Sequence, residues 1–213
     1  MPAPSSQPIL TIYAGPNGSG KTTCNEALKA SDPIRTLPYV NADVIALKKA
    51  QAQGYTTVNE LNDKLRYQLE LAAGKEALTQ RTALLSARAS FTLETTASSQ
   101  RTLDLIAHAH QQGYHVAVNF LYLPRVELNL ARIAQRVSQG GHSVPEPVVR
   151  RRYPRSIALI PALLQAADHF ELIDNSVSPT IVLRKSEKAV KVQPSPELGW
   201  TKERLERLLL GIL

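Results

Sequence analysis

The segment from Gly15 to Thr22 has the sequence GPNGSGKT and fits the pattern G-x-x-x-x-G-K-[S/T]. Glycines in such a loop let backbone N–H groups point at phosphate oxygens, and the lysine reaches the β- and γ-phosphates of a nucleotide. The hydroxyl of Thr22 would then hold Mg²⁺, and Lys21 would act on the transferring phosphate. We therefore predict a nucleoside-triphosphate site made by Gly15, Pro16, Asn17, Gly18, Ser19, Gly20, Lys21, Thr22 and Thr23.

The rest of the sequence limits what becomes of the terminal phosphate. The chain has no N-K-x-D motif of the kind that recognises guanine. It also has no strong apolar strand ending in Asp-Glu, which motors and helicases require. These observations favour a small-molecule kinase, which needs a base beside the acceptor hydroxyl, an acceptor pocket and a lid that carries arginine.

Asp43 is the candidate base. It follows a short apolar segment in YVNAD, where a strand would deliver it to the ligand-binding edge of a parallel sheet. A carboxylate there can accept the proton of an acceptor hydroxyl and hold that oxygen in line with the γ-phosphorus. The alternative is that Asn41 or Asp43 caps the helix that begins at this point.

A second carboxylate, Glu94, ends the predicted strand in FTLETT and is followed by Thr95 and Thr96. This combination suits contacts with sugar or ribose hydroxyls, or with a water molecule bound to Mg²⁺. The alternative is again structural, because Glu94 could cap the helix that follows.

Arginines gather between residues 125 and 156, where the chain has seven of them and no lysine. Arg132 and Arg136 are four residues apart and share one face of a predicted helix. Arg151 and Arg155 share one face of a second predicted helix. An arginine fork matches the geometry of phosphate oxygens better than a lysine does.

The turn GGHSVP joins these two helices. We expect the pair to form a lid, about residues 125–156, that closes over the phosphates and excludes water. We predict that His142, at the tip of the turn, makes a polar contact with the acceptor. Arg151 is predicted to bind the acceptor as well. The alternative is a solvated pair of basic helices.

These candidate residues need a scaffold, and the hydrophobic pattern supplies one. Apolar segments that resemble strands alternate with segments of helical periodicity, which predicts an α/β fold with a mostly parallel sheet of about five strands. The whole chain, 1–213, is expected to form one P-loop kinase domain, with a C-terminal hairpin and helix at about 180–213. Strands are predicted at 8–14, 37–40, 90–94, 115–123, 170–174, 180–184 and 188–193; helices are predicted at 21–30, 43–53, 57–88 in two pieces, 98–112, 126–138, 146–167 and 201–212.

The amino-acid composition further limits the class of protein. The single cysteine, Cys24, excludes an internal disulfide framework and suits the cytoplasm. No apolar run reaches the ~20 residues of a membrane span, so we expect no membrane partner. The start MPAPSSQP lacks the features of a signal peptide and is expected to be a frayed tail. The net charge of +7 keeps open a nucleic-acid-binding protein switched by ATP, but aromatic residues, on which bases would stack, make up only 5%.

Taken together, GPNGSGKTT, VNADVIA, FTLETT, VELNLARIAQRV, GGHSVPEPVVRRRYPRS and DNS resemble the zeta-toxin family of P-loop kinases. The resemblance runs from about Ile9 to Thr180. It implies a fold similar to the shikimate and adenylate kinases, with ATP and Mg²⁺ as cofactors. It also implies phosphorylation of a sugar hydroxyl of UDP-N-acetylglucosamine, and a small antitoxin partner that blocks the nucleotide site.

The resemblance also assigns roles to individual residues. It makes Lys21 the P-loop lysine, Asp43 the general base, and Glu94 with Thr96 part of the contact to the sugar nucleotide. Arg136, or alternatively Arg132, matches a lid arginine that stabilises the transferring charge. Asn175 and Ser176 lie where such kinases border the adenine, although an ordinary Asx turn accounts for them equally well. A nucleoside, a nucleotide or an antibiotic remains an alternative acceptor, because acceptor pockets vary by loop in this fold.

Overall fold

A computed structural model describes residues 7–31, 37–186 and 189–210 of the chain. The first six residues of the predicted N-terminal tail lie outside this part, as does the end of the predicted 201–212 helix beyond Leu210. None of the helices described combines the length and the apolar character needed to cross a bilayer.

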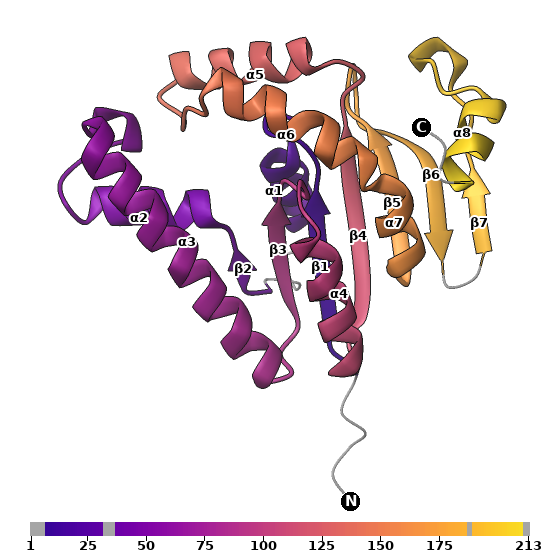
Figure 1. Cartoon of the computed structure of the whole chain (residues 1–213), viewed down its shortest axis with the longest axis horizontal. Coiled ribbons are helices and arrows are strands. Elements are labelled where there is room, and N and C mark those ends of the chain that lie inside the picture. The colour runs from indigo at the N-terminus through magenta and orange to yellow at the C-terminus, as the bar shows by residue number, and fades with distance from the viewer. Residues whose placement is uncertain (1–6, 32–36, 187–188, 211–213) are drawn as a thin grey trace, which may run out of the picture.

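One twisted sheet organises the molecule, with the strand order β2-β3-β1-β4-β5-β6-β7 (Figure 1). The first five strands in that order are parallel, as predicted, and the last two pair antiparallel. The C-terminal hairpin therefore continues the same sheet, which has seven strands in the described residues rather than about five. The strands are β1 (Ile9–Ala14), β2 (Tyr39–Val40), β3 (Phe91–Thr95), β4 (His115–Tyr122), β5 (His169–Asp174), β6 (Thr180–Ser186) and β7 (Ala189–Val192).

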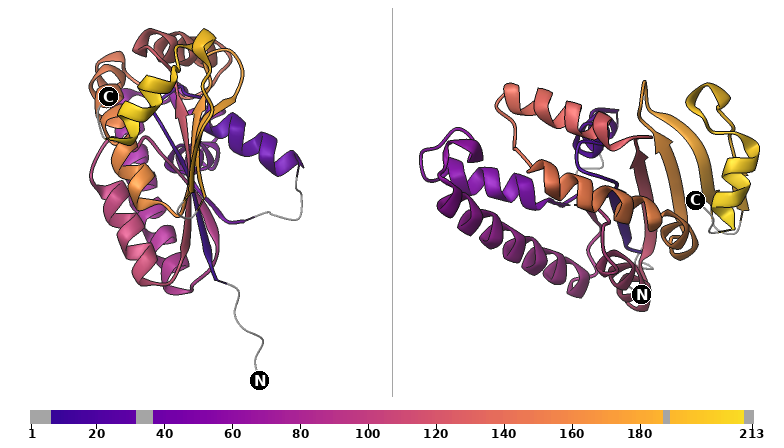
Figure 2. Two further views of the ribbon diagram at one scale, coloured as in Figure 1. Left: turned by 90° about the vertical axis from the view of Figure 1, so that its right-hand side faces the viewer. Right: turned by 45° about the horizontal axis from the view of Figure 1, so that its top comes forward.

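Helices cover both faces of the sheet, unequally. Figure 2 shows α1 on one face, whereas α4 and α7 lie on the other. In Figure 1, α5 and α6 cross the end of the sheet, and α2 and α3 lie side by side beyond β2. The helices are α1 (Lys21–Ser31), α2 (Ala42–Gln51), α3 (Asp63–Ser86), α4 (Arg101–Gln111), α5 (Val126–Ser138), α6 (Glu146–Ala158), α7 (Ile160–Ala166) and α8 (Lys202–Leu209), with short 3₁₀ helices η2 (Val58–Glu60) and η3 (Pro196–Leu198).

Most helix predictions hold within a few residues, and the predicted 146–167 helix shows the main difference. The structure divides it into α6 and α7 at Leu159. Pro161 stands at the start of α7 and has no N–H to give to the carbonyl of Ile157, which interrupts the helical hydrogen bonds at this point. Pro154 lies inside α6.

The apolar residues form two main groups. The large core joins the sheet to α4, α7 and α8, and includes the fully buried Ile12, Phe120 and Trp200. A smaller separate cluster holds α2, η2 and α3 together through residues such as Ile45 and Leu69. The carboxyl ends of the parallel strands lie at one edge of the sheet, and the predicted site residues lie at these strand ends or in the loops and helices that follow them.

Candidate active site

The loop between β1 and α1 is bent tightly against its neighbours. Gly18 has φ +76° and Gly20 has φ +94°, a region that side chains rarely adopt. A Cβ atom on Gly18 would lie 2.6 Å from the carbonyl oxygen of Asn129, and one on Gly20 would lie 2.3 Å from Nδ2 of Asn175. Both glycines are therefore required by conformation and by space, as expected for a phosphate-binding loop.

Two asparagines hold this loop from outside. Nδ2 of Asn129, on α5, donates to the carbonyl oxygen of Asn17 at 2.7 Å. Nδ2 of Asn175, just after β5, donates to the carbonyl oxygen of Ser19 at 2.8 Å. Asn129 is fully buried, and its role was not predicted from the sequence because it lies far from the loop in the chain. Helix α5 and the end of β5 thus hold the loop together.

Lys21 is buried, with 6% of its surface exposed. Its Nζ donates to the carbonyl oxygens of Gly15 and Pro16 at 2.9 and 2.8 Å. Burial lowers the pKa of this ammonium, and the carboxylates of Glu94 and Asp43 oppose that shift. The lysine therefore lies within the loop itself, with its charge balanced by two nearby carboxylates.

Glu94, at the end of β3, is the centre of a hydrogen-bond network. Its Oε2 accepts from the hydroxyl of Thr22 at 2.9 Å and from Nδ2 of Asn41 at 3.1 Å, and also from the hydroxyl of Tyr39. Burial, reinforced by the carboxylate, raises the pKa of Tyr39. Glu94 does not cap the next helix, since that helix begins at Arg101 on the far side of a loop. Tyr39 and Asn41 were not predicted at this network, although both lie in the YVNAD segment.

Asn41 is the cap of α2. Its Oδ1 accepts from the backbone N–H groups of Asp43 at 2.9 Å and Val44 at 3.4 Å. The alternative that Asp43 serves as the helix cap is thereby wrong. Asp43 is exposed on the first turn of α2 and lines the main cavity of the site.

A cavity of about 590 Å³ brings most of the predicted residues together. The loop after β1, the start of α2, η2, α5 and the turn after α5 surround it. The predicted residues among its lining are Gly18, Gly20, Lys21, Thr22, Thr23, Asp43, Glu94, Arg132, Arg136, His142 and Asn175. Residues not predicted, including Leu47, Thr57, Val58, Gln135 and Gln139, complete the wall.

The two arginines of α5 face this cavity from different positions. A terminal nitrogen of Arg132 donates to the carbonyl oxygens of Asn175 at 2.6 Å and Ser176 at 3.2 Å. A terminal nitrogen of Arg136 donates to the carbonyl oxygen of His142 at 2.6 Å. Nε of Arg136 and Nδ1 of His142 are buried and find no hydrogen-bond partner among the described residues. Buried polar atoms usually have hydrogen-bond partners, so these two mark the arginine and the histidine as unusual within the cavity lining.

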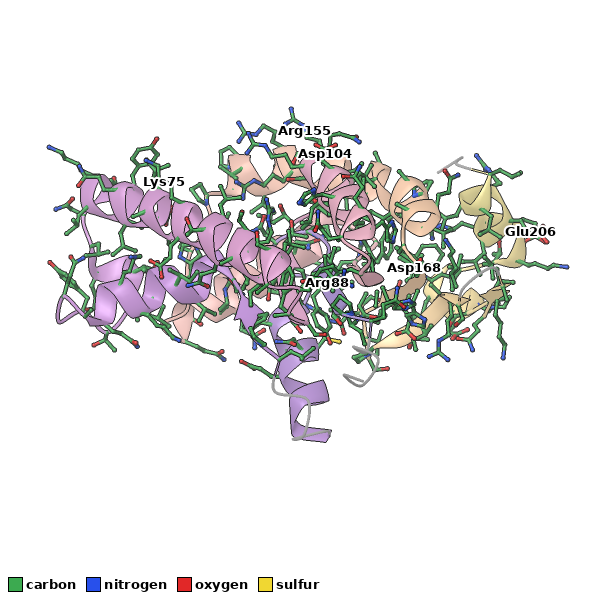
Figure 3. The ribbon with its side chains drawn as sticks, turned by 90° about the horizontal axis from the view of Figure 1, so that it is seen from below. Lys75, Arg88, Asp104, Arg155, Asp168 and Glu206 are labelled. Carbon is green, nitrogen blue, oxygen red and sulfur yellow. The ribbon has the colours of Figure 1, made fainter. Side chains whose placement is uncertain are left out.

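The arginines of α6 do not join this cavity. Arg150 is paired with Glu146 at 2.7 Å and with Glu127 at 3.1 Å, on the exposed surface. Arg151 is exposed and is not part of the cavity lining, and Arg155 points outward in Figure 3. Of the two helices that were expected to direct arginines at the phosphates, only α5 places arginines in the cavity lining. The arginines of α6 match the alternative of a solvated basic helix.

Thr96 is also outside the cavity lining. Its hydroxyl is 3.1 Å from that of Ser98, and its carbonyl oxygen accepts from the hydroxyl of Ser156 on α6. Ala97, which follows, is fully buried and has φ +46°. The segment after Glu94, which leads from β3 to α4, therefore contacts α6 through Ser156, and Thr96 does not line the cavity that contains Asp43.

A bridge between η2 and the turn after α5 closes one side of the cavity. Nδ2 of Asn59 donates to the carbonyl oxygen of Gly141 at 2.6 Å, and its Oδ1 accepts from the N–H of Ser143 at 3.2 Å. Nε2 of His142 lies 3.9 Å from Oε1 of Glu70, on α3. No sequence motif marks Asn59, because its partners are more than eighty residues away.

Comparisons with known proteins give a family match and a shared fold. The Zeta toxin family model matches residues 1–190 of the chain. An uncharacterized protein of Haemophilus influenzae (strain ATCC 51907 / DSM 11121 / KW20 / Rd) is 30% identical over 142 residues, which are 67% of this chain and 90% of that protein.

Solved structures share the fold. The structure of AvrRxo1-ORF1:-ORF2 with ATP matches with a TM-score of 0.72 at 18% identity; the match covers 98% of this chain and 65% of that chain, so this chain spans about two thirds of its length. The PezAT chromosomal toxin-antitoxin system of Streptococcus pneumoniae matches with a TM-score of 0.61 at 15% identity, covering 98% of this chain and 86% of that chain.

Proposed function

The chain belongs to the Zeta toxin family, and on that basis we propose that it is an ATP-dependent small-molecule kinase. The proposed reaction transfers the γ-phosphate of ATP to a hydroxyl of a sugar nucleotide such as UDP-N-acetylglucosamine. The observation that carries this proposal is one cavity shared by a phosphate-binding loop and the exposed carboxylate of Asp43.

The donor half of the cavity fits ATP. Side chains at Gly18 and Gly20 would collide with Asn129 and Asn175, so the glycines allow this tight bend, and the backbone amides of the loop and the start of α1 favour anionic oxygens there. Lys21 would exchange its two carbonyl partners for phosphate oxygens when the nucleotide binds. AvrRxo1, which has the same fold, was solved with ATP.

The same region fits Mg²⁺. A threonine hydroxyl and a carboxylate oxygen are the hard ligands that this ion takes, and Thr22 and Glu94 place such groups 2.9 Å apart. When bound, the ion would neutralise charge on the phosphates. Asn41 and Tyr39 would keep the Glu94 carboxylate oriented toward Thr22.

The acceptor half lies beside Asp43. Since Asn41 caps α2, the Asp43 carboxylate is available to accept the proton of an acceptor hydroxyl and to align that oxygen with the γ-phosphorus. Arg136, whose Nε has no partner among the described residues, is the lid arginine we assign to the transferring phosphate. His142 also lines the cavity and would contact the acceptor.

A panel of acceptors tests the proposal. The protein is incubated with ATP, Mg²⁺ and, separately, UDP-N-acetylglucosamine, other sugar nucleotides, nucleosides, nucleotides and antibiotics, and the products are identified by mass spectrometry. We expect UDP-N-acetylglucosamine to gain one phosphoryl group, and the Lys21→Met variant to give none. Release of ADP at the same rate with every acceptor, without a phosphorylated product, would contradict the proposal.

An antitoxin is the partner that this family suggests. The PezAT structure is described as a toxin-antitoxin system, and we infer that a small protein blocks the nucleotide site of this chain in the cytoplasm. Expression of the chain alone should arrest growth, and co-expression with a small protein encoded beside it should relieve the arrest. Normal growth during expression of active protein would exclude a toxin role.

A further inference from the structure

The segment after β7 folds back onto the sheet around the only tryptophan of the chain, Trp200. Backbone N–H groups of Ser195 and Trp200 donate to each other's carbonyl oxygens at 2.9 and 3.0 Å, which closes a tight loop. The Trp200 ring is fully buried, lies edge-on to the ring of Tyr122 at 4.9 Å, and is covered by the guanidinium of Arg204 at 4.0 Å. The ring is therefore held in one orientation.

That orientation aims the indole N–H at Asp174, the last residue of β5. Nε1 of Trp200 donates to Oδ2 of Asp174 at 2.7 Å. Oδ1 of the same carboxylate accepts from the N–H of Ser176 at 2.8 Å and from its hydroxyl. Asp174 is fully buried, so each of these donors is needed to keep its carboxylate satisfied.

The residue after Asp174 contacts the donor site directly. The N–H of Asn175 donates to the carbonyl oxygen of Tyr122 at 3.0 Å, and its side chain donates to Ser19 in the phosphate-binding loop. Its carbonyl oxygen accepts from Arg132. Hydrogen bonds therefore link the indole to Asp174, and the next residue in the chain, Asn175, to the loop and to one cavity arginine.

We infer that Trp200 is a positioning residue for ATP: through Asp174 it fixes Asn175, and through Asn175 it sets the position of the phosphate-binding loop and Arg132. The inference rests on the proposed function. It gives the C-terminal segment a role at the donor half of the site, although none of the residues that the structure describes after β7 line the cavity. The acceptor half, on α2 and η2, lies outside these contacts.

The test is the dissociation constant for Mg·ATP, measured by calorimetry on the Trp200→Phe variant. Phenylalanine keeps an aromatic ring in the core but removes the N–H. We expect binding to weaken by roughly tenfold, the scale of one hydrogen bond to a charged group, while the KM for the acceptor stays unchanged. The Asp174→Asn variant, which keeps the size of the side chain, should weaken Mg·ATP binding in the same way.

Leu205→Val is the matched control. Leu205 is fully buried in α8, so the change loosens the same C-terminal segment but leaves the indole N–H in place. Its melting temperature should fall without a change in Mg·ATP affinity. In the wild type, tryptophan emission should change on addition of Mg·ATP and saturate with the calorimetric constant.

Three results separate the possibilities. Wild-type affinity in both Trp200→Phe and Asp174→Asn would overturn the inference, as would equal weakening in Leu205→Val, because the segment would then act only through stability. A wild-type protein that binds no Mg·ATP would instead overturn the proposed function on which the inference rests.

Discussion

The donor half and the acceptor half of the cavity are supported by different hydrophobic clusters. The phosphate-binding loop follows a central strand of the large core and is tied from outside by Asn129 and Asn175. The wall that carries Asp43 belongs to α2, η2 and α3, which pack around their own small cluster. The two-residue strand β2 leads into this wall, and the Asn59 bridge joins its far end to the turn after α5.

This difference separates the donor half, whose geometry must stay constant, from the acceptor half, whose shape can vary. Every kinase of this kind binds the same triphosphate, and a loop fixed from several sides can hold it in one geometry. Acceptors differ between enzymes, and a wall on a separate small cluster can change shape without disturbing the loop. Fewer buried contacts also mean that the wall should open locally at lower free energy than the sheet. Four predictions, the first with a pH effect attached to it, test this contrast, beginning with the largest effect.

Replacement of the donor-side lysine should have the largest effect. Lys21→Met keeps a long side chain but removes the charge aimed at the phosphates, so turnover should fall by about 10²–10³-fold. The free energy of unfolding should not fall, because burial disfavours the ammonium. Steady-state kinetics and thermal melting measure the two effects. Turnover within a few-fold of the wild type would remove Lys21 from the chemistry.

The same lysine predicts a pH effect on stability. Its pKa is below the ordinary value of 10.5 in the folded chain, so the unfolded state binds more protons between the two values. Wild-type stability should therefore rise with pH in the interval below 10.5 and be lost as pH falls through the folded pKa. Lys21→Met should lack this contribution. Identical pH profiles for the two proteins would contradict the buried position of the lysine.

Crowding at the loop gives the second prediction. In Gly20→Ala the new Cβ would lie 2.3 Å from Nδ2 of Asn175, so the side chain that holds the loop must move. We expect Mg·ATP affinity to fall by at least tenfold, or about 1.4 kcal/mol. Gly54→Ala is the control: it has φ +87° and nothing within 4 Å, and lies at the end of α2. It should lose stability by about 1–2 kcal/mol through backbone strain and bind Mg·ATP normally. Equal affinities in the two variants would refute the tight fit.

The third prediction concerns the Asn59 bridge. Asn59→Ala removes two hydrogen bonds between the acceptor wall and the turn that contains His142. The KM for the acceptor should rise by roughly fivefold, about 1 kcal/mol, with Mg·ATP affinity unchanged. Asn62→Ala removes the cap of α3, in the same wall, and should cost stability without raising the KM. A change in Mg·ATP affinity with Asn59→Ala would mean that the two halves are not independent.

The smallest expected effect comes from making the same substitution, Ile to Val, once in the small cluster and once in the large core. Ile45→Val in the small cluster and Ile12→Val in the large core each remove one methyl group, at a cost of about 0.5–1.5 kcal/mol. Hydrogen exchange should accelerate only in α2 and α3 for Ile45→Val. For Ile12→Val it should accelerate throughout the sheet. Acceleration of the sheet by Ile45→Val would show that the wall and the sheet unfold together.

The scaffold could be predicted largely from local patterns. Strand β1 and helix α5 were found from their apolar spacing, and the loop from its glycines and Lys21. The spacing of Arg151 and Arg155 correctly implied a shared helix face, but spacing alone does not say which way a face points, and this one points away from the cavity. The packing of α6 in the folded chain therefore decided between a lid helix and a solvated helix.

The parts of the site that were missed depend on contacts between distant segments. Glu94 was predicted as a carboxylate at the sheet edge, but its bond to Thr22 requires β3 to pair with β1. Asn129 and Asn59 have ordinary sequence surroundings and gain their roles only from partners in other elements. The division at Leu159 was the exception, because Pro161 was a local signal that the helical periodicity concealed.

The central claim, that Asp43 activates an acceptor against ATP held in the loop, is tested most directly by single-turnover kinetics. Wild-type protein and Asp43→Asn are each loaded with Mg·ATP, mixed with UDP-N-acetylglucosamine and quenched at intervals, and the phosphorylated sugar nucleotide is measured. The account predicts equal loading with ATP and transfer slower by about 10²–10⁴-fold in Asp43→Asn. Transfer at the wild-type rate in that variant would contradict it.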